Sequence, residues 1–229
     1  MNQSHKSELS EERIQTSFLA KPEKKALLWM APRIPSWISP DMLSYFGLLG
    51  LMISGISYYL AYLHWGFFIL ASIGMIINWL GDSLDGTLAR VRNKQRPKYG
   101  YYLDHLIDAF GISFFMIGIS YSNIITQPLA WIVLILFFIT CINTYLATNT
   151  IKVFKISHLK ISTTEARVLL IIMNIILVFC KKITLFGFTA FCLDYLAVLI
   201  SVYMLIATIR SAYKNLSKLG QEERALWDK

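Results

Sequence analysis

The sequence predicts an all-α integral membrane protein, in which six transmembrane helices follow an N-terminal amphipathic interfacial helix. Three observations predict this class: the composition, the long apolar runs and the placement of Lys and Arg. Of the 229 residues, 55% are hydrophobic and 16% are charged, and the mean hydropathy is +0.52. Soluble domains carry about 25% charged residues, so this composition is that of a membrane protein. We divide the chain into an interfacial segment (1–38), a six-helix transmembrane domain (39–211) and a cytoplasmic tail (212–229).

Six apolar runs are candidates for the transmembrane helices. A helix needs about 20 mostly apolar residues to cross the hydrocarbon core of a bilayer. The fifth run is shorter than this and could instead be a tilted or interfacial segment. The candidates are residues 40–63, 66–89, 101–120, 128–148, 165–180 and 187–209.

The segment before the first span has an amphipathic composition. Residues 9–37 mix Leu, Ile, Phe and Trp with Lys, Arg and Glu. This mixture indicates a helix that lies in the headgroup plane, and we expect Pro22 and Pro32 to interrupt it. A soluble tail without a role is the alternative interpretation. Pro40 then stands where proline is favoured, at the start of the first transmembrane helix.

The distribution of Lys and Arg predicts the orientation. Of 22 such residues, all but Lys181 and Lys182 would lie on one side of the membrane if the six spans are correct. Because basic residues accumulate on the cytoplasmic side, both termini and the 90–99 loop should be cytoplasmic. We therefore expect a multi-pass protein of the cell (inner) membrane. The formal charge of +8 is then explained by anionic lipid headgroups, with no nucleic-acid partner.

Two pairs of aspartates interrupt the apolar pattern at the cytoplasmic ends of two spans. Asp82 and Asp85 are three residues apart, and Asp104 and Asp108 are four apart. On helices, each spacing places both carboxylates on one face. A short loop joins the two helices, so we expect all four carboxylates to converge on one pocket. Four uncompensated charges would repel one another strongly, and one or two divalent cations would remove this repulsion.

The ligand chemistry predicts the type of cation. Oxygen ligands alone favour Mg²⁺ or Mn²⁺ over zinc, and Mg²⁺ keeps positions open for substrate phosphate oxygens. The basic 90–99 loop beside the pocket would suit an anionic substrate. Gly86 and Gly100 leave room for a ligand to approach the backbone. The alternative is purely structural, with the aspartates forming buried ion pairs with Arg90 or Arg92.

The aspartates belong to a longer pattern of eight residues at fixed spacing. The pattern is Asp82-x2-Asp85-Gly86-x2-Ala89-Arg90, nine further residues, and then Gly100-x3-Asp104-x3-Asp108. It resembles the motif of the CDP-alcohol phosphotransferases, also called CDP-alcohol phosphatidyltransferases. The resemblance implies the six spans, the preceding interfacial helix and transfer of a phospho-alcohol group from a CDP-alcohol to an acceptor hydroxyl, with release of CMP. It implies metal dependence with two ions, and we also expect a homodimer.

The resemblance also implies roles for the acidic residues. Asp82, Asp85 and Asp104 match ligands of the first metal, and Asp82 and Asp104 also face the second. Asp108 matches a ligand of the second metal that accepts the proton of the acceptor hydroxyl.

Four further residues match positions that bind the CDP group. Gly86 and Arg90 are two of them. The others are Asp41 and Ser44, because many members have Pro-Asn-x-x-Thr where this chain has Pro-Asp-Met-Leu-Ser at 40–44. Asp41 adds a negative charge that the family pattern lacks.

Several other polar residues have a structural and a functional interpretation. Thr163, Thr164 and Glu165 predict a helix N-terminus, and Arg167 behind them could bind an acceptor headgroup. His105 follows Asp104 but should face about 100° away from it on the helix. The last two spans contain Asn174 and Asp194, and we expect Asp194 to be structural.

The substrate is the least determined part of the prediction. Family members transfer phosphatidyl from CDP-diacylglycerol to a polar alcohol, or phosphocholine or phosphoethanolamine from its CDP ester to diacylglycerol. The small size of the chain and the basic region near Arg167 favour CDP-diacylglycerol, whereas the Asp-His-x-x-Asp spelling at 104–108 favours the alternative. A membrane prenyltransferase and a small cation transporter are more distant alternatives. The first would need a third acid at Ala89, and the second usually has polar residues spread over several spans.

Overall fold

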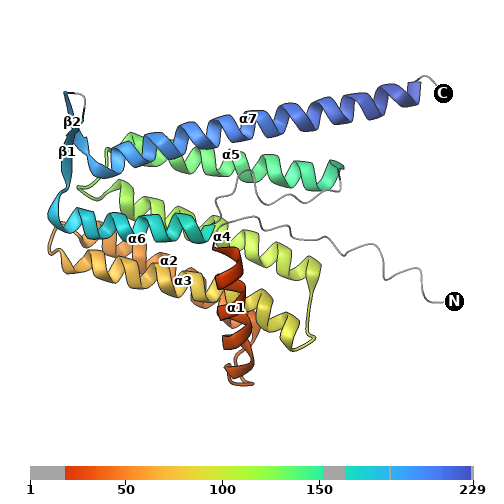
Figure 1. The fold of residues 1–229 in the computed structure, drawn as a ribbon, viewed down its shortest axis with the longest axis horizontal. Helices are drawn as coiled ribbons and strands as arrows, with labels where there is room; N and C mark the ends of the chain where they lie inside the picture. The colour runs from red at the N-terminus through yellow and green to blue at the C-terminus, as the bar shows by residue number, and fades with distance from the viewer. Residues whose placement is uncertain (1–18, 152–162, 186, 228–229) are drawn as a thin grey trace.

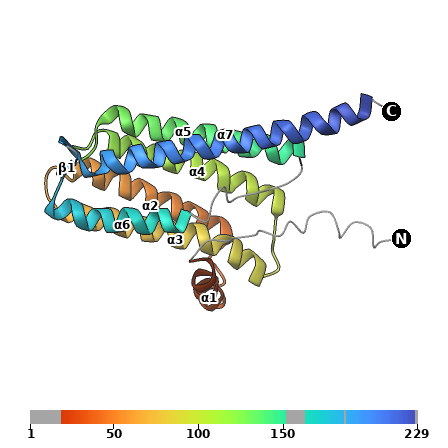
Figure 2. The ribbon, with the colours of Figure 1, turned by 45° about the horizontal axis from the view of Figure 1, so that its top comes forward.

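The computed structural model describes residues 19–151, 163–185 and 187–227. Long helices run side by side, and one short helix near the N-terminus crosses their direction (Figures 1 and 2). The elements are α1 (Ala20–Met30), η1 (Ala31–Arg33), α2 (Pro40–Leu60), α3 (Gly66–Val91), α4 (Pro97–Ser120), α5 (Gln127–Ile151), α6 (Thr163–Phe179), β1 (Lys182–Leu185), β2 (Phe188–Phe191) and α7 (Cys192–Trp227).

The predicted all-helical membrane fold is confirmed. Within the described residues, five helices are long and apolar enough to cross a membrane, namely α2, α3, α4, α5 and α7. Helix α6 has 17 residues, somewhat fewer than the roughly 20 of a full span, as its short apolar run indicated. It nevertheless lies alongside the others in both views (Figures 1 and 2).

The last predicted span differs from the structure at both ends. Instead of beginning at residue 187, it is preceded by an antiparallel hairpin in which β1 pairs with β2, Lys182 opposite Phe191. Gly187 lies in the hairpin turn with φ +84°, a left-handed conformation that glycine adopts without strain. Helix α7 then continues without a break to Trp227, because its polar extension contains no proline. The predicted tail at 212–229 is therefore helical up to that residue.

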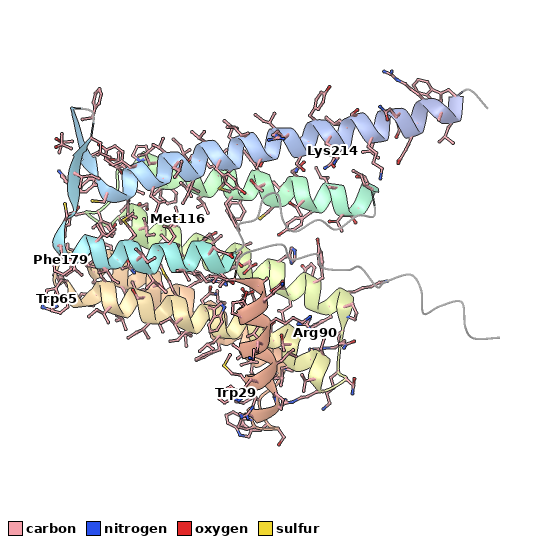
Figure 3. All side chains as sticks on the ribbon, viewed as in Figure 1. Trp29, Trp65, Arg90, Met116, Phe179 and Lys214 are labelled. Carbon is pink, nitrogen blue, oxygen red and sulfur yellow. The ribbon has the colours of Figure 1, made fainter. Side chains whose placement is uncertain are left out.

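Helix α1 forms the N-terminal element that the amphipathic pattern predicted. The earlier part of that segment, residues 9–18, lies outside the described residues. Pro22 lies in the first turn of α1, and Pro32 lies in η1, directly after α1 ends. The two prolines therefore stand at the two ends of α1 and do not interrupt it. Leu27 of α1 is buried against Leu84 and Leu88 of α3, whereas Trp29 is 61% exposed and projects from the far end of α1 (Figure 3).

Arg92 fixes the connection between α1 and the first span. Its guanidinium donates hydrogen bonds to the carbonyl oxygens of Ile34 (3.0 Å), Pro35 (2.8 Å) and Ile38. Arg92 therefore does not form the buried ion pair with the aspartates that the structural alternative required of it. Arg92 instead holds the 34–38 segment at the end of α3.

Helix α2 packs extensively against both α3 and α4. Glycines permit the close approach: a Cβ atom on Gly50 would lie 2.5 Å from the backbone of Asn78 and Gly74 in α3. In the same way, a Cβ on Gly118 of α4 would collide with the carbonyl oxygen of Gly55. Small residues of this kind are typical of helix contacts in membranes. The acidic faces of α3 and α4 meet because both helices are pressed against α2.

Helices α5 and α7 form a second, parallel pair held by polar contacts. The hydroxyls of Thr140 and Thr208 are 2.8 Å apart. At the hairpin end, Asp194 accepts hydrogen bonds from the backbone N–H (2.6 Å) and hydroxyl (2.8 Å) of Thr126. Asp194 is therefore structural, as expected. Asn174 is also structural, because it accepts from the Tyr58 hydroxyl (2.6 Å) and donates to Ser72 (2.9 Å).

Candidate active site

Three carboxylates from two helices gather at one point of the bundle. Asp82 of α3 and Asp104 and Asp108 of α4 each offer an oxygen, and these oxygens all lie within 4.8 Å of one another. Ligand oxygens about 2.1 Å from an ion lie roughly 3 to 4 Å apart, so small side-chain rotations would bring all three onto one cation. The donor set contains oxygen alone, as a hard divalent cation prefers. The residues therefore fit a divalent metal.

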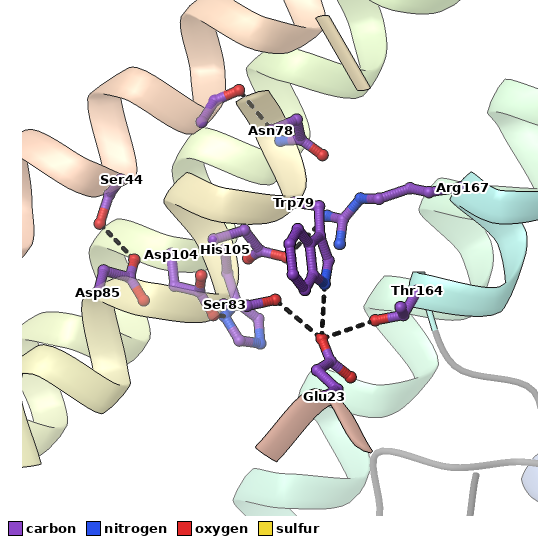
Figure 4. A network of polar contacts seen from close by, with 12 residues as sticks. Glu23, Ser44, Asn78, Trp79, Ser83, Asp85, Asp104, His105, Thr164 and Arg167 are labelled. Carbon is purple, nitrogen blue, oxygen red and sulfur yellow. Dashed lines mark hydrogen bonds and ion pairs between the residues drawn. The ribbon is translucent and has the colours of Figure 1, made fainter. Parts of the chain in front are cut away.

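Asp85 lies in the same pocket but has a different partner. Its Oδ2 accepts a hydrogen bond of 2.5 Å from the hydroxyl of Ser44 in α2 (Figure 4). All four predicted aspartates thus line one pocket, although Asp85 stands outside the group of three. Among the residues that the structure describes, the pocket is lined by Ser44, Gly47, Asn78, Asp82, Asp85, Asp104, Ile107 and Asp108.

A cation from a third helix already reaches this group. Arg167 of α6 donates from Nη2 to Oδ2 of Asp82 at 2.7 Å, and the Arg167 side chain is only 15% exposed. Its other terminal nitrogen, Nη1, is buried without a hydrogen-bond partner among the described residues. From the sequence we expected Arg167 to bind the headgroup of the acceptor substrate. In the structure it contacts the carboxylate of Asp82. The pocket thus offers a negative side for a cation and a donor for an anion.

The two motif glycines, Gly86 and Gly100, are not required for packing. A Cβ on Gly100 would meet nothing within 4 Å, and one on Gly86 would meet only the flexible guanidinium of Arg90, at 3.4 Å. Space beside them is consistent with the expected approach of a ligand. Arg90 is an exposed residue, and its guanidinium donates to the Thr87 hydroxyl at 2.9 Å. The predicted CDP contacts of Gly86 and Arg90 stay predictions.

Asp41 lies outside the pocket lining and has a cationic partner. Its carboxylate pairs with Arg96 and accepts a hydrogen bond from the Tyr99 hydroxyl at 3.2 Å. The hydrogen bond to Asp41 raises the pKa of the Arg96 guanidinium. The extra negative charge of Asp41 is therefore compensated, and it joins the start of α2 to the start of α4. The predicted nucleotide contacts of Asp41 and Ser44 also stay predictions.

His105 contributes to a wall of aromatic rings rather than to the carboxylate group. Its ring packs on Tyr101, with centroids 4.1 Å apart, and on Tyr145 of α5, at 5.1 Å. Its Nδ1 is 3.6 Å from Oδ2 of Asp104. The histidine thus adjoins a predicted metal ligand while facing a different neighbour, as the helical offset predicted.

One acidic residue near the site, Glu23, was not predicted from the sequence. Glu23 of α1 bonds to Trp79 and Ser83 of α3 and to Thr164 of α6. The sequence feature that could have identified Glu23 is its place as a single acid among basic residues of an amphipathic helix, Lys21, Lys24 and Lys25.

Comparison with known proteins decides the family. The family model described as CDP-alcohol phosphatidyltransferase matches residues 37–209, which include the pocket and all four aspartates. The chain belongs to the CDP-alcohol phosphatidyltransferase family. Members of this family transfer phospho-alcohol groups from CDP-alcohols and use divalent metals. No curated protein matched the chain. Helix α1, which precedes residue 37, lies outside the matched region of the chain.

Proposed function

We propose that this protein transfers a phosphatidyl group from CDP-diacylglycerol to the hydroxyl of a small polar alcohol and releases CMP. We propose Mg²⁺ or Mn²⁺, as two ions, as the cofactor. The observation that carries the proposal is the gathering of the Asp82, Asp104 and Asp108 oxygens within 4.8 Å, in a chain of this family. The choice of CDP-diacylglycerol as donor rests on Arg167 and on the basic residues at 152–162. These residues could hold a phosphorylated acceptor, which the phosphatidyl transferases use. Residues 152–162 lie outside the described residues.

Asp82, Asp104 and Asp108 would hold the metal, with Asp85 beside them. The bound cations would neutralise the negative charge of the pyrophosphate and of the leaving CMP. Ser44 would keep the Asp85 carboxylate oriented through its 2.5 Å hydrogen bond. The buried Nη1 of Arg167 would donate to a phosphate oxygen of the substrate, which gives that nitrogen the partner it lacks within the described residues.

Asp108 would act as the general base. Its carboxylate would accept the proton of the acceptor hydroxyl while the hydroxyl oxygen forms a bond to the phosphorus that carries the alcohol. The bond between this phosphorus and the CMP oxygen breaks, and CMP leaves with the bonding electron pair. The rigid packing of α3 and α4 on α2 would hold the reacting groups in place, which is a major source of rate enhancement.

A matrix of donors and acceptors tests this function. Purified protein in detergent should release CMP from CDP-diacylglycerol when a polar alcohol is present, and the lipid product should contain that alcohol. Turnover of CDP-choline or CDP-ethanolamine with diacylglycerol, without turnover of CDP-diacylglycerol, would reverse the donor assignment and retain the family chemistry. Absence of CMP release from every donor would contradict the proposal as a whole.

We also propose that the pocket faces the cytoplasm, because basic residues surround this end of the bundle. Arg90 lies at this end, while Trp65 and Phe179 lie at the opposite end (Figure 3). In a variant whose three native cysteines are replaced by serine, a cysteine introduced at Lys181, beside the hairpin, should react with a membrane-impermeant maleimide added to intact cells. One introduced at Lys94 should react only after the membrane is opened. The reverse pattern would overturn the orientation.

A further inference from the structure

One carboxylate oxygen joins α1, α3 and α6 beside the pocket. Oε1 of Glu23 accepts hydrogen bonds from Trp79 Nε1 (2.8 Å), the Ser83 hydroxyl (3.0 Å) and the Thr164 hydroxyl (2.9 Å). Figure 4 shows the three donors converging on this atom. All three are neutral groups. Glu23 therefore acts as a shared acceptor between helices that are far apart in sequence.

The donors stand next to the Arg167–Asp82 ion pair. Ser83 directly follows Asp82 on α3, and Thr164 lies in the first turn of α6, three residues before Arg167. These two donors come from the two helices that supply the ion pair. The position of the Glu23 oxygen thus affects how the N-terminal end of α6 meets α3.

A second contact joins the same two helices, α1 and α6. The backbone N–H of Leu19, at the start of α1, donates to Oε1 of Glu165 at 3.0 Å. The first turns of α1 and α6 therefore hold each other through one acid from each. Elsewhere α6 packs mainly on α3, so these hydrogen bonds link its N-terminal turn to α1 as well.

We propose that Glu23 is a positioning residue that fixes the first turn of α6 against α3, so that Arg167 faces the aspartate pocket. This role rests on the proposed function, because Arg167 matters there as the donor to a substrate phosphate. The competing account is that α1 only attaches the protein to the membrane surface. In that account Glu23 would have no specific link to Arg167.

Three single variants separate these accounts. Glu23→Ala removes the shared acceptor, whereas Glu23→Gln keeps a carbonyl oxygen at the same place. Lys24→Ala is the matched control, because Lys24 is an exposed neighbour on the same helix. We expect Glu23→Ala to raise the KM for the phosphate-bearing substrate about tenfold with a smaller change in kcat. Glu23→Gln and Lys24→Ala should stay close to wild type, and equal loss in the Ala and Gln variants would overturn the proposal.

A double-mutant cycle tests whether Glu23 acts through Arg167. When Arg167→Gln is already present, adding Glu23→Ala should raise KM less than about twofold, since the group being positioned is gone. If the two changes multiply in full, Glu23 does not act through Arg167 and the proposal is wrong.

Hydrogen–deuterium exchange tests the positioning without any substrate. Exchange of the 163–172 backbone amides should be faster in Glu23→Ala than in wild type, and unchanged in Glu23→Gln and Lys24→Ala. The 196–206 segment of α7 serves as an internal control for intact folding. Unchanged exchange at 163–172 in Glu23→Ala would contradict the positioning role of Glu23. This measurement does not require turnover of any donor, so failure of the positioning role and failure of the proposed function remain distinguishable.

Discussion

Asp82→Asn is expected to lower CMP release by at least about 100-fold. Loss of groups that merely support metal ligands costs about 10- to 100-fold in activity, so loss of a ligand and its charge should cost more. Asp82 carries the largest expected effect because it belongs to the close carboxylate group and also receives the hydrogen bond from Arg167. Steady-state CMP release from purified protein measures the effect.

The matched control for Asp82→Asn is Glu222→Gln. Glu222 forms an exposed pair with Lys218 on α7, at 3.7 Å, so this variant removes one negative charge far from the pocket. Its activity should equal that of wild type. Size-exclusion elution should be the same for both variants, because Asn at position 82 can still accept from Arg167. Activity of Asp82→Asn within a few-fold of wild type would remove Asp82 from the metal site.

Asp108→Asn is expected to separate binding from chemistry. As the proposed base, Asp108 acts on the acceptor proton, so its loss should slow the chemical step by about 10² to 10⁴-fold. Binding of the CDP-alcohol donor should be weakened less than in Asp82→Asn. Equilibrium binding of a radiolabelled donor and single-turnover CMP release measure the two quantities separately. If both variants lose donor binding equally, Asp108 is a metal ligand and not the base.

The spacing of the aspartates predicted part of the geometry of the pocket. The three- and four-residue spacings placed each aspartate pair on one helix face, and the structure brings all four into one pocket. The reason is only partly the short loop between α3 and α4. Both helices also pack on α2, through glycines at positions such as Gly50 and Gly118, and spacing within the motif carries no information about that third helix.

The partners of the site depend on contacts that local patterns do not encode. Arg167 meets Asp82 across 85 residues of sequence, and Glu23 meets Thr164 across 141. Amphipathic periodicity identifies the buried face of a helix but not the atom that a polar side chain there will contact. The sequence could therefore place Arg167 near a substrate without showing its ion pair, and it gave no role to Glu23.

The start of the last predicted span differs from the structure for a different physical reason. Hydropathy averages over a window, so strand β2 was indistinguishable from the beginning of the span predicted at residue 187, and β1 fell in the predicted loop before it. Their β-branched and aromatic residues, such as Thr184 and Phe188, favour strands, and Gly187 supplies the turn. The polar extension of α7 beyond residue 211 has no hydropathy signal, yet it contains many good helix formers.

If the aspartate pocket holds a divalent cation, titration with Mn²⁺ will detect the binding. The EPR signal of free Mn²⁺ is followed as purified wild-type protein and Asp82→Asn are added in detergent. Wild type should bind Mn²⁺ saturably, Mg²⁺ should displace it, and Asp82→Asn should bind at least about tenfold more weakly. Absence of saturable binding by wild type, or equal binding by both proteins, would contradict a divalent-cation site in this pocket.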